Sequence, residues 1–292
     1  SPLHSSGPPV SSNRAEPRME AARDEPLLGR GADLQGPEPE RADLGNVVFF
    51  CILGGLCKMV PALDDFLVYF VRRHMVSSQL RKLPTLQGVG VRVLSQPPRL
   101  CLRCARKCVY FGCCCCWWEL LCHVLCFAWT LKEGVDVAST LLHEGWLIAY
   151  ALKAGHLNEI TNSEDLWRIR QAMTHACDVV DTSPITQILK KAFSGSKELL
   201  RHSARRLVEA LRVHGVHTSA APNPGAMEET LDELEGEERA ELRGLQDALA
   251  EALGTQKPYF RQLGIIFEQK MGKLKAEGAK PAWCAAMLMG GR

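Results

Sequence analysis

Residues 101–131 constrain this chain more than any other stretch, because cysteine and tryptophan here follow a basic leader. The leader places cysteines among basic residues, namely Cys101, Arg103, Cys104, Arg106, Lys107 and Cys108. Four consecutive cysteines and two tryptophans follow. From residue 109 to 131 only Glu119 and His123 are ionisable. At about 1.5 Å per residue, a helix of this segment would span the roughly 30 Å hydrocarbon core of a bilayer.

The favoured interpretation is a helix that lies on or inserts into a membrane. Cysteines next to such a helix are the usual substrates of reversible palmitoylation, which predicts lipidation at Cys113, Cys114, Cys115 and Cys116. Tryptophan suits the interface, where its ring is buried and its N–H stays hydrated. Cations just outside the segment suit anionic headgroups. This predicts a basic membrane-surface set of Arg99, Arg103, Arg106 and Lys107.

Two other interpretations remain open. The first is a metal site, because a C-x-x-C spacing has the geometry of zinc ligands. Its ligands would be Cys101, Cys104, Cys108 and Cys113 or a neighbour. No second, distant C-x-x-C pair completes the usual arrangement of two separated knuckles. The second is a buried helix of a soluble protein in which cysteine acts as a small apolar residue. Either alternative leaves the chain soluble.

The distribution of cysteine and charge limits the remaining classes of protein. Eleven of thirteen cysteines lie between Cys51 and Cys126, and the count is odd. Secreted disulfide frameworks space their cysteines along the fold, so we expect reduced thiols that face the cytosol or a membrane. The net charge of +2 creates no overall field that attracts nucleic acid. Nucleic acid is therefore not an expected partner.

Residues 1–45 are predicted to form a disordered tail, because Pro, Gly, Ser, Glu and Arg dominate their composition. The tail contains Asp24 followed by Leu27 and Leu28. This pattern resembles the acidic dileucine signals that vesicle-coat adaptors read. Such short motifs are common, and a solvated tail explains the residues equally well.

Residues 46–155 are predicted to be a membrane-associated, Cys/Trp-rich helical region. Its first segment, residues 46–71, is strongly apolar until Lys58, Pro61, Asp64 and Asp65 interrupt it. Carboxylates at the bilayer midplane would each cost about 3 kcal/mol. We therefore expect a short re-entrant or interfacial helix pair bent at Pro61. The alternative is a core helix followed by an amphipathic helix.

A basic connector, residues 72–107, links the two most apolar segments. It carries nine Lys or Arg residues and no Asp or Glu. The positive-inside rule applies to a connector of this length and places it in the cytosol. Proline and glycine at several positions predict an irregular backbone. No aromatic residue is interleaved among the charges to stack nucleic-acid bases.

The C-terminal half is predicted to be helical. Residues 135–152 form an amphipathic stretch, and residues 156–216 contain three helices. The first begins at the capping box Thr161-Asn162-Ser163-Glu164, and the second begins beside Pro184. The third has a basic outer face and could pair with the acidic helix that begins near residue 228. Residues 226–278 are predicted to form a helical hairpin, and residues 279–292 show no pattern.

The predicted fold class is therefore mainly α, with membrane-associated apolar helices, a soluble helical region after them and a disordered N-terminal tail. No phosphate-binding glycine loop, nucleophile elbow or catalytic His/Cys/Asp spacing is present. We predict a non-enzymatic scaffold, adaptor or trafficking factor at a membrane, without a cofactor. Its partners would be membrane lipids and proteins that bind its helical surfaces. The alternatives are a soluble metal-binding protein and a lipid-acting membrane enzyme.

Overall fold

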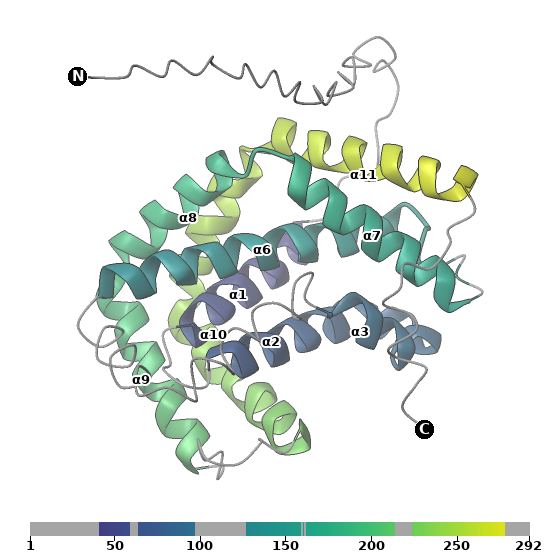
Figure 1. The fold of residues 1–292 in the computed structure, drawn as a ribbon. Helices are drawn as coiled ribbons and strands as arrows, with labels where there is room; N and C mark the ends of the chain where they lie inside the picture. The colour runs from purple at the N-terminus through teal and green to yellow at the C-terminus, as the bar shows by residue number, and fades with distance from the viewer. Residues whose placement is uncertain are drawn as a thin grey trace, which may run out of the picture. The chain divides into compact units, whose positions relative to one another are not determined.

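A computed structural model describes residues 41–58, 64–96, 127–158, 160, 162–213 and 224–277. Every regular element in these ranges is a helix (Figure 1), which confirms the prediction of a mainly α fold. The α-helices are α1 (Arg41–Cys57), α2 (Asp64–Gln79), α3 (Val89–Leu94), α6 (Phe127–Lys153), α7 (Ser163–Val179), α8 (Ser183–Gly195), α9 (Lys197–Val213), α10 (Pro224–Gly254) and α11 (Lys257–Glu277). Two 3-10 turns, η1 (Leu80–Lys82) and η2 (Pro84–Leu86), connect α2 to α3.

The apolar helix α1 forms the centre of the core. Its residues 47–53 are at most 2% exposed. Helices α2, α6, α9 and α10 pack around it, and Figure 1 shows α1 running beside α6. A helix that is apolar on all sides needs burial on all sides, and neighbouring helices of this chain supply that burial. The structure therefore shows a core helix followed by an amphipathic helix, the alternative to an interfacial pair. Pro61 lies outside the described residues.

Glycines allow α1 and α6 to approach each other closely. A Cβ atom on Gly54 of α1 would lie 2.2 Å from Cδ1 of Leu141. A Cβ atom on Gly145 of α6 would lie 2.7 Å from Cγ1 of Val47. Real Cβ atoms do not tolerate such distances, so a side chain at either position would push the helices apart. Small residues on both helices thus set the spacing at the centre of the fold.

The first part of the basic connector is more regular than its composition predicts. Residues 72–94 lie in the second half of α2, the two 3-10 turns and α3. Gly90 is buried inside α3, where it packs against Leu86. Packing against the core therefore overrides the helix-breaking tendency of glycine. The remaining residues of the connector, 97–107, lie outside the described residues.

Local sequence signals predicted the starts of two helices to within about one residue. Asn162 is the N-cap of α7, and its side chain accepts a hydrogen bond from the Asp165 backbone N–H at 3.0 Å. The cap is thus one residue later than the box predicted from Thr161. Helix α8 begins with Pro184 in its first turn. The Asp181 carboxylate also accepts the Ser183 backbone N–H at 3.0 Å, which satisfies one of the free donors at that end.

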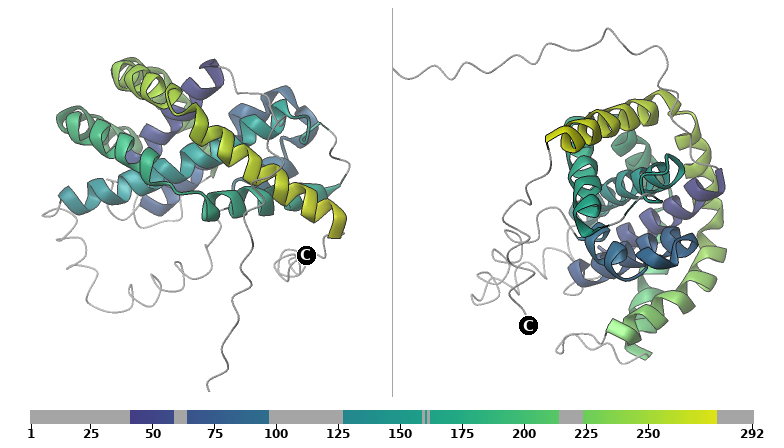
Figure 2. Two further views of the ribbon diagram at one scale, coloured as in Figure 1. Left: turned by 90° about the horizontal axis from the view of Figure 1, so that it is seen from above. Right: turned by 90° about the vertical axis from the view of Figure 1, so that its right-hand side faces the viewer.

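The basic helix α9 packs on the acidic helix α10 within the same chain. Arg206 of α9 forms an ion pair with Glu241 of α10. Helix α11 packs chiefly on α7, whereas α10 packs on α1, α2, α8 and α9 (Figure 2). The two helices expected to form a hairpin therefore pack on other helices. Their apolar faces are buried by helices other than each other.

All described helices contribute to one buried core, which extends from Val47 to Leu274 in the sequence. Helices on both sides of the expected boundary at residue 156 take part in it. Within the described ranges, no helix combines the length and the apolar character that crossing a bilayer requires.

Candidate functional site

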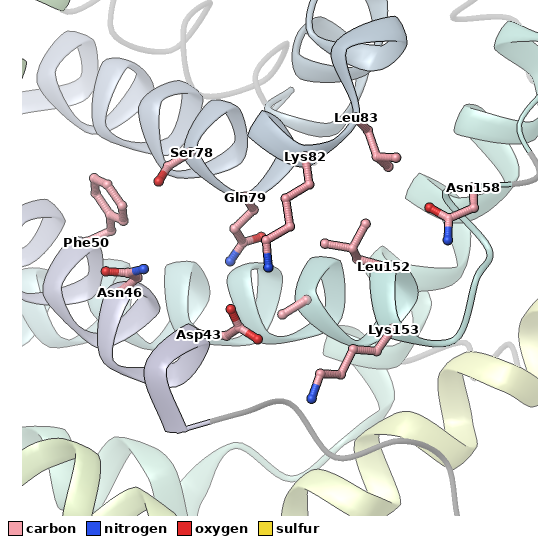
Figure 3. Close-up of a pocket in the computed structure, with 11 residues that line it drawn as sticks. Asp43, Asn46, Phe50, Ser78, Gln79, Lys82, Leu83, Leu152, Lys153 and Asn158 are labelled. Atoms are coloured by element: carbon pink, nitrogen blue, oxygen red, sulfur yellow. The ribbon is translucent and has the colours of Figure 1, made fainter.

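A cavity of about 480 Å³ opens where the start of α1, the end of α2 and the end of α6 meet. Its volume is in the range of small-molecule pockets, about 300–1,000 Å³. Figure 3 shows side chains from these elements surrounding it. The lining residues are Asp43, Asn46, Phe50, Ser78, Gln79, Lys82, Leu83, Ala149, Leu152, Lys153 and Asn158.

Three polar side chains from different elements converge in this cavity. Gln79 donates from Nε2 to the Gly145 carbonyl at 3.0 Å, while its Oε1 is buried without a partner. The Lys82 amine and the Asp43 carboxylate point toward the same space as the Gln79 amide (Figure 3). Among the described residues, neither Lys82 nor Asp43 forms an ion pair. The cavity thus presents the Lys82 amine, the Asp43 carboxylate and the buried Gln79 Oε1 to one ligand, and a second cation, Lys153, also lines it.

The rest of the lining is part polar and part apolar. Its polar members are Asn46, Ser78, Lys153 and Asn158. Its apolar members are Phe50, Leu83, Ala149 and Leu152, and Phe50 is itself only 1% exposed. A pocket that combines apolar side chains with convergent polar groups is typical of a binding site for an amphiphilic small molecule.

A second polar feature, the buried Glu144 cluster, consists of Glu144, Arg72 and Arg170. The Glu144 carboxylate lies 2.7 Å from Arg72 Nε and 3.0 Å from Arg170 Nη2. The contact between Arg72 Nε and the Glu144 carboxylate is an ion pair, but it does not have the geometry of a hydrogen bond. Arg170 also donates to the Gln96 carbonyl just after α3. All three side chains are at most 7% exposed. The cluster therefore joins α2, α6 and α7 inside the core, away from solvent.

His143 occupies a neighbouring buried position on α6. Because the Ser139 carbonyl can only accept, His143 Nδ1 carries the proton and donates to it. The neutral Nε2 then accepts from the Tyr259 hydroxyl of α11. Burial lowers the pKa of His143 below its usual 6.5. His143 is therefore a neutral link between α6 and α11.

We expect this histidine to weaken the fold in mild acid. The unfolded state binds a proton near pH 6.5, whereas folded His143 resists protonation, so stability falls as pH drops below 6.5. One such proton contributes up to about 1.4 kcal/mol per pH unit. Urea unfolding at pH 7.5 and 5.5 should show a larger loss in the wild type than in His143→Gln. Equal losses in the two proteins would contradict this assignment.

The described cysteines do not have the properties of nucleophiles. Cys51 and Cys57 are buried in α1, and burial raises the pKa of both thiols. Burial also raises the pKa of Cys177 to about 12. A thiol that stays protonated at neutral pH is a poor nucleophile and a poor metal ligand. Within the described ranges, no group of three or more His, Cys, Asp or Glu could hold a metal.

The site residues predicted from sequence lie outside the described residues. This applies to the lipidation set, the basic membrane-surface set, the alternative zinc ligands and the sorting signal. No sequence motif marked the residues that line the cavity, although Lys82 is one of the nine basic residues of the connector. Asp43, Gln79 and Lys82 belong to three elements, and no motif spacing links residues that only the fold brings together.

Comparison with known proteins adds no further constraint on this site. The chain matches no family model, no curated protein and no solved structure.

Proposed function

We propose that this chain is a non-enzymatic helical adaptor or scaffold held at a membrane through residues 101–131. The observation that carries the proposal is the apolar cysteine- and tryptophan-rich stretch with its basic leader. Acyl chains on Cys113, Cys114, Cys115 and Cys116 would supply the anchor. The helical unit would present its outer surfaces to protein partners in the cytosol.

The described part of the basic connector supports a position of this connector at the cytosolic face of the membrane. Arg81, Lys82 and Arg92 are exposed, as is the apolar Val89 at 57%. No acidic residue occurs between positions 72 and 107 to oppose them. Each such cation near an anionic leaflet contributes about 1 kcal/mol before screening. Arg72 is the exception, because it is buried against Glu144.

Replacing all four cysteines at 113–116 by serine should release the protein from membranes in cells. One acyl chain gives only marginal binding, and stable anchoring needs two or more signals. Single substitutions should therefore leave most of the protein membrane-bound. The measurement is fractionation with and without hydroxylamine, which cleaves thioesters.

A matched variant carries Cys101→Ser, Cys104→Ser and Cys108→Ser and should stay on membranes. If the wild type is soluble and contains zinc that this triple variant loses, the metal-binding alternative replaces our proposal. Absence of any lipid released by hydroxylamine would exclude acylation as the anchor.

A further inference from the structure

We propose that the cavity between α1, α2 and α6 binds the headgroup of an aminophospholipid, that is, a phosphodiester bearing a primary ammonium group. This inference rests on the proposed membrane association and specifies the lipid class that the helical unit recognises. None of the cavity residues belongs to the cysteine-rich stretch 101–131, so headgroup binding can be measured without acylation.

The anionic end of such a ligand fits Lys82. Its amine points into the cavity and has no ion-pair partner among the described residues (Figure 3). A hydrogen bond from an ammonium group to a phosphate oxygen is among the stronger ones in proteins, because both groups are charged. Lys82 also belongs to the basic connector, as do the exposed Arg81 and Arg92, and this connector is the part of the chain expected to meet an anionic leaflet.

The cationic end fits Asp43 together with Gln79. The Gln79 Oε1 atom is buried and lacks a donor, because its amide nitrogen is already committed to the Gly145 carbonyl. A primary ammonium group carries three N–H donors, enough for both Gln79 Oε1 and the Asp43 carboxylate. A choline headgroup has no N–H and would leave Gln79 Oε1 unsatisfied. The site should therefore prefer ethanolamine and serine headgroups to choline.

The apolar lining residues argue for a lipid over a free zwitterion. Phe50, Leu83, Ala149 and Leu152 would contact the glycerol carbons and the first carbons of the acyl chains. A deacylated headgroup keeps the glycerol carbons but lacks the acyl carbons, so it would gain less from these residues. Their burial by ligand carbons gives the acylated molecule its advantage in affinity.

The test uses the full-length protein and short-chain lipids below their micelle concentration, titrated by calorimetry. We expect dihexanoyl phosphatidylethanolamine and phosphatidylserine to bind at least about tenfold more tightly than the choline and glycerol analogues. The glycerol lipid is anionic but lacks an ammonium group, so it separates headgroup recognition from simple charge attraction. Equal binding of all four lipids, or binding of none, would overturn the proposal.

Glycerophosphoethanolamine tests the source of the headgroup. It should bind at least about tenfold more weakly than the dihexanoyl lipid, because it lacks the acyl carbons that would meet the apolar lining residues. Equal affinity would identify the ligand as a soluble zwitterion and overturn the lipid assignment. Because monomeric lipids need no membrane, a failure here is distinguishable from a failure of acyl anchoring.

Substitutions test the two ends of the ligand separately. Lys82→Gln and Asp43→Asn should each weaken phosphatidylethanolamine binding by about tenfold. The matched controls are Arg81→Gln, a neighbouring exposed cation that does not line the cavity, and Asp247→Asn on the exposed face of α10. Thermal unfolding checks that all four variants fold. If the cavity variants bind like the controls, the assignment of the cavity is wrong.

Discussion

Replacing Ile52 by Asp should prevent the chain from folding. Ile52 is 0% exposed at the centre of α1. The substitution removes a buried aliphatic side chain, at about 2–5 kcal/mol, and adds an unpaired buried charge that costs several kcal/mol more. The sum is comparable with the whole stability of a typical domain, about 5–15 kcal/mol. Circular dichroism and size-exclusion chromatography of the purified variant should show loss of cooperative unfolding and aggregation.

The matched control is Val89→Asp, which introduces the same charge at a position that is 57% exposed. Its stability should change by no more than about 0.5 kcal/mol. If Ile52→Asp folds as cooperatively as the control, α1 is not the core helix of this fold. The pair of variants therefore distinguishes a core helix from one that faces lipid or solvent.

Replacing Glu144 by Gln should lower the free energy of unfolding by about 3–5 kcal/mol. The substitution leaves Arg72 and Arg170 buried together without a counter-charge. Removing one partner of a buried ion pair is costly because the remaining charge keeps its full desolvation penalty. Urea denaturation at pH 7 should show a lower midpoint with an unchanged slope.

Glu241→Gln is the surface counterpart of this change, because Glu241 pairs with Arg206 where both side chains are about one-third exposed. Exposed pairs contribute only about 0–1 kcal/mol. Replacing the whole buried cluster, with Arg72→Met, Glu144→Leu and Arg170→Met, should recover much of the lost stability, since buried ion pairs exchange well for apolar groups. Equal effects of Glu144→Gln and Glu241→Gln would contradict the burial of the cluster.

The two proposals concern complementary contacts with a membrane. Acyl chains at residues 113–116 would hold the protein by burial of hydrocarbon, which is insensitive to headgroup. The cavity around Lys82 and Asp43 would add a preference for one headgroup class. Lipid anchoring that combines two signals is stable where either alone is marginal. An adaptor built in this way would select both a membrane and a lipid composition.

Features that depend on short-range interactions could be predicted from the sequence. The start of α7 follows from a side chain that caps a backbone N–H, although the cap is Asn162 and not the predicted Thr161. The start of α8 follows from Pro184, which suits the first turn because it lacks an N–H and has a fixed φ. The helical nature of the C-terminal half follows from apolar spacing along the chain. The charges of basic α9 and acidic α10 allowed them to pair either within the chain or with a partner, and the Arg206–Glu241 contact shows that they pair within the chain.

The burial of the apolar helices and the contacts between distant polar groups depend on how the helices pack. A helix that is apolar on all sides suits a bilayer and a protein core equally, and for α1 the helices packed around it settled the choice. Glu144 meets Arg72 and Arg170 because α2, α6 and α7 converge. The cavity likewise exists because Asp43, Gln79 and Lys82 come together from three elements. Such long-range contacts depend on packing, which the local pattern of residues does not encode.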